Sequence, residues 1–230
     1  MPDTASKVTE GAASIVTADS HAIVTADHSP VGGLAHDARG GISNPILGML
    51  LFISSEVMFF AGLFAAYFST RANFVDANGV KEWPPSEFAH ILNPFSLILV
   101  ATIVLILSSV TLQMAIWAIR KDDRRGFIRN MAVTFILGIL FLVMQAIDYS
   151  WLFADGLTMG SGPFGTTYFT LTGFHGAHVF GGVIMLGVVL YRGLTGQFSS
   201  RHHDAVEAAS LYWHFVDVVW IILFSILYFL

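Results

Sequence analysis

Five ionisable side chains interrupt long apolar stretches of the sequence and are the first candidates for chemistry. They are Glu56, His175, His178, His214 and Asp217. The spacing of His214 and Asp217 places both on one face of a helix, and His175 and His178 have the same spacing. An ionisable group at the centre of a membrane helix costs about 2.5 to 3.5 kcal/mol on insertion scales. We therefore expect these faces to point at protein.

Three kinds of site could use such a set. Carboxylates and imidazoles inside a membrane commonly form a path for protons or ions. The three histidines could instead be ligands of a haem or another metal, although two histidines on one helix cannot bind opposite faces of one porphyrin. The third kind is a hydrogen-bonded network that holds helices in register. The residue spacing favours the network and leaves the other two open.

The composition predicts an all-α membrane protein. Of the 230 residues, 55% are hydrophobic and 12% are charged, whereas an ordinary soluble domain has about 25% charged residues. Five apolar stretches each exceed the roughly 20 residues that cross a bilayer. We therefore predict a bundle of five transmembrane helices, at residues 45–69, 94–119, 130–153, 166–191 and 205–230.

The first 43 residues differ from the rest of the chain. They are rich in Ala, Ser, Thr, Asp, Gly and His and have no continuous apolar segment. We predict that residues 1–43 form a disordered or loosely docked tail and that residues 44–230 form the membrane domain.

The five ionisable residues are predicted to lie at a common depth. At a rise of about 1.5 Å per residue, each lies roughly 9 to 12 residues from one end of its predicted helix. All five are therefore expected near the bilayer midplane, within one or two helical turns of one another. This coincidence of depth makes a shared polar network the simplest expectation.

Lys and Arg are distributed unequally among the predicted connections. Seven lie after the second and fourth helices, and two lie in the other connections. The positive-inside rule then places the amino terminus in the cytoplasm and the carboxyl terminus outside. The seven are Arg120, Lys121, Arg124, Arg125, Arg129, Arg192 and Arg201; the two are Arg71 and Lys81.

Two more groups of residues are candidates for function. Gly173, Ala177 and Gly181 form a stripe of small residues on the predicted fourth helix, opposite its two histidines, which would let helix backbones approach closely. Titratable residues also cluster in the connection before the last helix, where they could collect protons on the cytoplasmic side or simply be a solvated loop. They are His202, His203, Asp204 and Glu207.

Charge and cysteine content exclude other classes of protein and site. The formal net charge of -5 argues against nucleic-acid binding. The absence of cysteine leaves neither disulfides nor thiolate metal ligands.

Four motifs, occurring in order, resemble subunit III of the haem-copper oxidases, the cytochrome c oxidase family. They are SEVMFF at 55–60, WPP at 83–85, GFHGAHV at 173–179 and YWHFVDVVW at 212–220. The longer members of that family have seven helices, so this chain is similar to the five-helix form found in many bacteria. The WPP loop and Glu56 favour the cytochrome c branch over the quinol-oxidising branch.

The resemblance implies a core subunit without a redox centre of its own, in the cytoplasmic membrane of a bacterium. Haem a and copper would lie in partner subunits of an aa3-type oxidase active in aerobic respiration. The implied partners are the catalytic subunit I, subunit II, a small additional subunit, bound phospholipids and a respiratory supercomplex. The implied role is to support proton uptake by the proton-pumping complex and to stabilise it. A quinol oxidase subunit and, in a different class, a free-standing transporter or haem protein are the alternatives.

Overall fold

The computed structural model describes residues 43–75, 79, 81–89 and 95–230. The predicted tail at residues 1–43 lies, apart from Ser43, outside the described residues. The predicted start of the second transmembrane helix at residue 94 lies outside them too.

The described residues form six helices and no strand. The long ones are α1 (Asn44–Asn73), α3 (Leu97–Arg120), α4 (Arg124–Ala154), α5 (Pro163–Leu194) and α6 (Asp204–Tyr228). All five are long and apolar enough to cross a membrane, so the predicted all-α architecture with five spans is confirmed. The remaining helix, α2 (Ser86–Ala89), has four residues and was not predicted, because one turn of helix carries no apolar period.

The helix ends differ from the apolar limits where polar residues continue a helix beyond the hydrocarbon. The clearest case is α4, which begins at Arg124 and not at residue 130. The Asp123 side chain accepts a hydrogen bond of 2.9 Å from the Gly126 amide and so caps the helix. Hydropathy marks the part of a helix that lies in lipid, whereas the cap determines where the helix starts.

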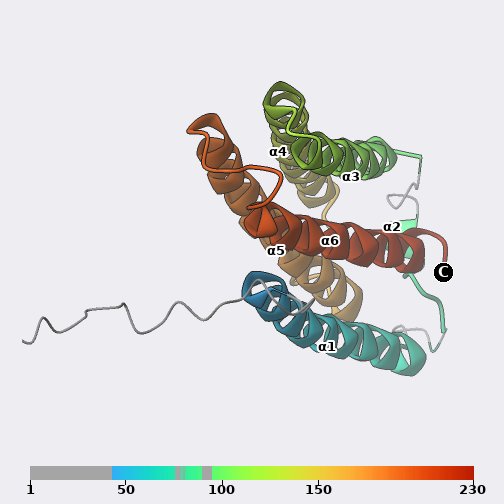
Figure 1. The fold of residues 1–230 in the computed structure, drawn as a ribbon. Helices are drawn as coiled ribbons and strands as arrows, with labels where there is room; N and C mark the ends of the chain where they lie inside the picture. The colour runs from blue at the N-terminus through green and yellow to red at the C-terminus, as the bar shows by residue number, and fades with distance from the viewer. Residues whose placement is uncertain (1–42, 76–78, 80, 90–94) are drawn as a thin grey trace, which may run out of the picture. The chain divides into compact units, whose positions relative to one another are not determined.

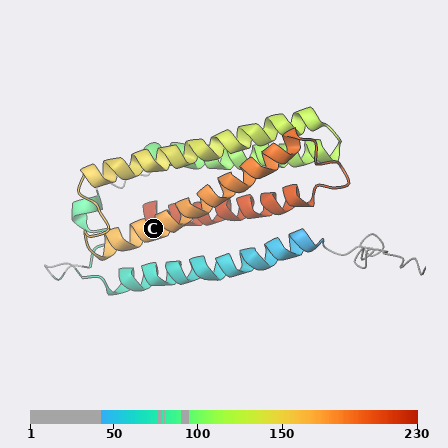
Figure 2. The same cartoon turned by 90° about the vertical axis from the view of Figure 1, so that its left-hand side faces the viewer.

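The helices of the membrane domain pack in a fixed order. Helices α5 and α6 lie between α1 and the hairpin of α3 and α4, as Figures 1 and 2 show. Among the described helices, α1 contacts α5 and α6 alone. In the most apolar part of each helix, 56% of α6 but only 6% of α1 is buried within the chain. Helix α6 is therefore the centre of the bundle, and α1 is its most peripheral member.

Trp213 of α6 occupies the point where four helices meet. Its indole is fully buried and fits against Gly138 of α4 and Gly182 of α5, where an added Cβ would lie 2.7 and 2.8 Å from the ring. Its Nε1 donates a hydrogen bond of 2.9 Å to Ser108 Oγ of α3. The two glycines thus provide the space that lets one large side chain tie α6 to three neighbours.

The predicted stripe of small residues does not supply this close contact within the described chain. Ala177 and Gly181 are exposed and Gly173 is half-buried. A Cβ on Gly181 would come no nearer than 3.8 Å to another atom, the Tyr212 hydroxyl. The packing role of Gly173, Ala177 and Gly181 stays a prediction.

Replacing Gly182 with Ala should destabilise the bundle, because the new Cβ would overlap the fully buried indole of Trp213. We expect a loss of about 1 to 3 kcal/mol, typical of overpacking, seen as a lower melting temperature of the protein purified in detergent. Gly181→Ala is the matched control, since it removes a neighbouring helical glycine without a clash. Equal melting temperatures for the two variants would contradict the conclusion that Gly182 provides the space for the Trp213 ring.

Candidate functional site

The first polar contact joins the peripheral helix α1 to α5. Glu56 Oε2 lies 2.8 Å from His178 Nε2, and the two side chains are 17% and 16% exposed. The rings of Phe59 and Phe60 lie 5.9 and 4.9 Å from the imidazole. This is the one described side-chain pair of titratable groups that links two membrane-spanning segments in the middle of the bundle.

The hydrogen bonds of His178 define how this pair holds a proton. Its Nδ1 lies 2.7 Å from the Phe174 carbonyl oxygen. A carbonyl only accepts, so Nδ1 must be the donor. The proton between Nε2 and Glu56 is then shared by the pair, which is either a neutral carboxyl bonded to a neutral imidazole or an ion pair. In both forms the side chains satisfy each other, as a low-dielectric environment requires.

The second polar contact joins α6 to α3 through a serine. Ser109 Oγ lies 2.8 Å from His214 Nδ1 and is also hydrogen-bonded to Asp217 Oδ2. Asp217 is 5% exposed, and its Oδ1 is buried without a hydrogen-bond partner among the described residues. His214 is only half-buried. The predicted sharing of one helix face by His214 and Asp217 therefore leads to a common partner on another helix.

The third contact is made by His175, which is fully buried where α4, α5 and α6 meet. Its Nε2 lies 3.2 Å from the Val216 carbonyl oxygen of α6 and so donates to it. The ring packs 4.7 Å from Trp220 and 6.0 Å from Phe141, measured between ring centroids. Nδ1 has no partner among the described residues.

The five predicted midplane residues thus form three separate contacts. The three histidines bond to three different helices: His178 to α1, His214 to α3 and His175 to α6. Among the described residues, no group of three or more His, Cys, Asp or Glu side chains is placed to hold a metal ion. The arrangement can tie helices together and hold protons at fixed atoms.

The hydroxyl partners on α3 were not predicted from the sequence. Ser109 completes the second contact, and Ser108 and Thr102 accept hydrogen bonds of 2.9 and 3.0 Å from the indoles of Trp213 and Trp220. The available signal was the adjacent Ser108 and Ser109 in the middle of an apolar stretch. Hydroxyls are inexpensive in a helix because they can bond to the preceding turn, so they do not stand out as charged residues do.

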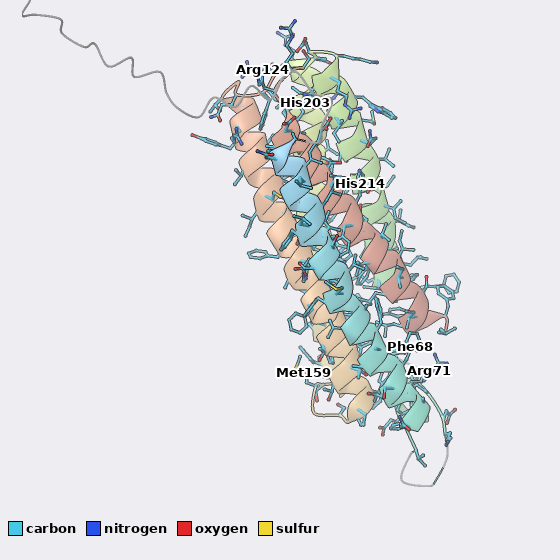
Figure 3. The ribbon with its side chains drawn as sticks, turned by 60° about the horizontal axis from the view of Figure 1, so that its bottom comes forward. Phe68, Arg71, Arg124, Met159, His203 and His214 are labelled. Carbon is cyan, nitrogen blue, oxygen red and sulfur yellow. The ribbon has the colours of Figure 1, made fainter. Side chains whose placement is uncertain are left out.

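The predicted loop cluster lies at one end of the bundle and is only partly assembled. Glu207 Oε1 accepts from Arg120 at 2.7 Å and lies 3.1 Å from His203 Nε2. His202 bonds to Ser199 through its backbone, and Asp204 begins α6. Arg120, from the end of α3, was not predicted in this cluster. Figure 3 shows His203 and Arg124 at this end of the bundle, and Arg71 and Met159 at the other.

A carboxylate in the neighbouring turn anchors the same loop. Asp122 has the left-handed φ of 56°, which Asp tolerates better than most residues. It accepts hydrogen bonds of 2.7 and 2.9 Å from the hydroxyl and the amide of Ser200. These bonds, chiefly the one from the hydroxyl, hold the pKa of Asp122 below its usual value. The turn between α3 and α4 is thereby fastened to the connection between α5 and α6.

Known proteins share this sequence over most of its length. A family model described as cytochrome c oxidase subunit III matches residues 32–230. The cytochrome c oxidase subunit 3 of Corynebacterium diphtheriae is 45% identical over 185 residues, which are 80% of this chain and 87% of that protein. A probable cytochrome c oxidase subunit 3 of Mycobacterium tuberculosis is 42% identical over 184 residues, again 80% and 87% of the two chains. The subunit 3 of Sus scrofa is 42% identical over 182 residues, 79% of this chain and 67% of that protein.

The contact between Glu56 and His178 predicts different outcomes for two substitutions. Glu56→Leu removes the bond that holds α1 to α5 and should lower the melting temperature of the purified protein. The expected loss is about 0.6 kcal/mol and at most about 1.7 kcal/mol, the range measured for hydrogen bonds between membrane helices. Glu56→Gln is the control, because its amide can donate to Nε2 of His178. A Leu variant as stable as the Gln variant would show that the contact contributes nothing.

Proposed function

Because the chain belongs to the cytochrome c oxidase subunit III family, we propose that it is the non-redox core subunit of a bacterial aa3-type cytochrome c oxidase. Membership makes it one subunit of a multi-subunit haem-copper oxidase complex. In the proposal it packs on the catalytic subunit I, stabilises the complex, holds phospholipids and supports proton uptake during aerobic respiration.

The proposal is carried by the observation that the predicted midplane polar groups form hydrogen bonds between helices. Each histidine bonds to a different helix, and the carboxyls of Glu56 and Asp217 are engaged by partners on other helices. A subunit built in this way has its imidazoles committed to helix packing. We therefore assign the haem a and copper of the complex to partner subunits, and to this chain a structural role beside them.

The exposed apolar surface of α1 supports assembly with other subunits. Helix α1 is almost uncovered by the rest of the chain, and many of its large apolar side chains, such as Leu51 and Met58, are exposed. We propose subunits I and II, a small additional subunit and bound lipids as the partners that cover such surfaces, within a respiratory supercomplex. The amino terminus is proposed to be cytoplasmic and the carboxyl terminus to lie outside, on the strength of the basic residues at the Arg124 end of the bundle.

Purification of a tagged copy tests the proposal directly. We expect the chain to co-purify with haem-containing subunits that oxidise reduced cytochrome c. The chain separated from them should show no Soret band. Oxidation of a quinol instead would assign the complex to the other branch of the superfamily. A chain that purifies alone, or that carries its own haem, would overturn the proposal.

The loop cluster predicts a pH-dependent effect on turnover. Replacing His202, His203 and Asp204 together with Asn should slow oxygen reduction at high pH, because protons are then scarce and must be collected. Turnover at acidic pH should stay unchanged, and Asn at 203 remains a suitable residue to cap α6. Asp155→Asn, in the connection at the opposite end, is the control. If turnover of the triple variant had the same pH dependence as that of the unmodified complex, these residues would be a solvated loop without a role in proton collection.

A further inference from the structure

One face of α6 lies open between α1 and α3 and contains a single imidazole. The residues of this face recur every three or four positions: Leu211, His214, Val218, Ile221 and Ser225. Val218 is 55% exposed and Ile221 44%, and Ile106 on the adjoining edge of α3 is 42% exposed. His214 is therefore set in apolar surroundings on a surface that the rest of the chain does not cover, about midway along α6 (Figure 3).

The hydrogen bonds behind this face leave one atom of His214 unused. Ser109 Oγ carries one proton. If it donates to Asp217, it accepts from Nδ1 of His214, and Nε2 is left as an acceptor. If Asp217 is protonated and donates to Ser109, the serine donates to Nδ1, and Nε2 is left as an N–H donor. In either arrangement the chain of bonds ends at Nε2, which bonds to no described residue.

Lipid cannot complete this chain of bonds. Both His214 and Ser109 lie near the middle of their helices, and the hydrocarbon core is about 30 Å thick, so polar headgroups are roughly 15 Å away. Acyl chains offer neither donor nor acceptor, and an unsatisfied polar group in hydrocarbon is costly. A polar side chain of another membrane helix is the group that can reach this depth.

We propose that the α3–α6 face around His214 binds a transmembrane helix of a partner subunit, and that this helix places a hydroxyl or amide side chain against Nε2 of His214. Either group can both donate and accept, so it satisfies Nε2 in both arrangements. Val218, Ile221 and Ile106 supply the apolar contacts around the polar one. The proposal rests on the proposed function, since it requires an assembly that contains a membrane-spanning partner.

The open Nε2 of His214 distinguishes this face from the other exposed surfaces. Much of α1 is equally uncovered, but its exposed large residues, such as Leu51 and Met58, are apolar and are suited to lipid. At the α3–α6 face, lipid would leave Nε2 unsatisfied, whereas a helix with one polar residue would not. The same chemistry fixes the register of the partner, because its polar residue must lie at the depth of His214.

Crosslinking from an apolar neighbour of His214 tests which molecule covers this face, and it leaves Ser109, His214 and Asp217 unchanged. Val218 or Ile106 would be replaced by a photo-reactive benzoyl-phenylalanine in the complete complex, and the membranes would be irradiated. We expect both probes to form an adduct with a polypeptide other than this chain. Adducts with lipid alone would overturn the proposal.

Substitution of the imidazole tests the hydrogen bond. His214→Leu should lower the retention of this chain with the haem-containing subunits during detergent washing by about threefold, the change that an average hydrogen bond between membrane helices would produce. His214→Gln keeps a polar group at this position and should be retained almost normally. Ser225→Ala is the matched control on the same face, because its hydroxyl is already satisfied by the Ile221 carbonyl at 2.7 Å.

The outcomes separate this proposal from the proposed function. If the unmodified chain does not co-purify with haem-containing subunits, the proposed function fails. If it does co-purify but the probes at 218 and 106 label only lipid, this inference alone fails. His214→Leu also removes the bond to Ser109, so a lower melting temperature of the separated chain would assign its effect to internal packing. The crosslinks from Val218 and Ile106 then decide the question.

Discussion

Hydrogen bonds that side chains of one helix make to another helix are the interaction on which this bundle depends. Lipid is as apolar as leucine, so apolar burial alone does not select one arrangement of transmembrane helices. Helix α6 makes the selecting bonds: its two buried tryptophans donate to hydroxyls of α3, and its Val216 carbonyl accepts from His175 of α5. Because each donor has one partner at one depth, sliding a helix by a turn would leave several polar groups unsatisfied at once.

The glycines of α4 and α5 make these bonds possible. Trp213 can reach Ser108 only because Gly138 and Gly182 leave room for its ring. Close packing and hydrogen bonding are thus coupled at a single residue. The same coupling explains why α6 is central and α1 is peripheral, since the one described polar contact between the transmembrane part of α1 and another helix is that of Glu56 with His178.

The distribution of the polar groups also bears on what the subunit does. Groups that are bonded in separate pairs, facing different neighbours, do not form one continuous path or one ligand set among the described residues. Two of the three contacts are closed by the chain itself or are buried in it. The contact at His214 ends at a half-buried ring on an open face. The open hydrogen-bonding position on this exposed face is what we expect of one subunit in a larger assembly.

The sequence by itself determined the membrane class and the five spans, because apolar length is a local property. The common depth of the polar residues follows from a rise of about 1.5 Å per residue and stays a prediction. Four motifs were enough to indicate the family. Only the tertiary structure decided which helix each histidine bonds, that Ser109 joins His214 to Asp217, and that Gly182 and not Gly181 receives a neighbouring ring. Periodicity gives the face on which a residue lies but not the helix that this face meets. That choice depends on the packing of all five helices together.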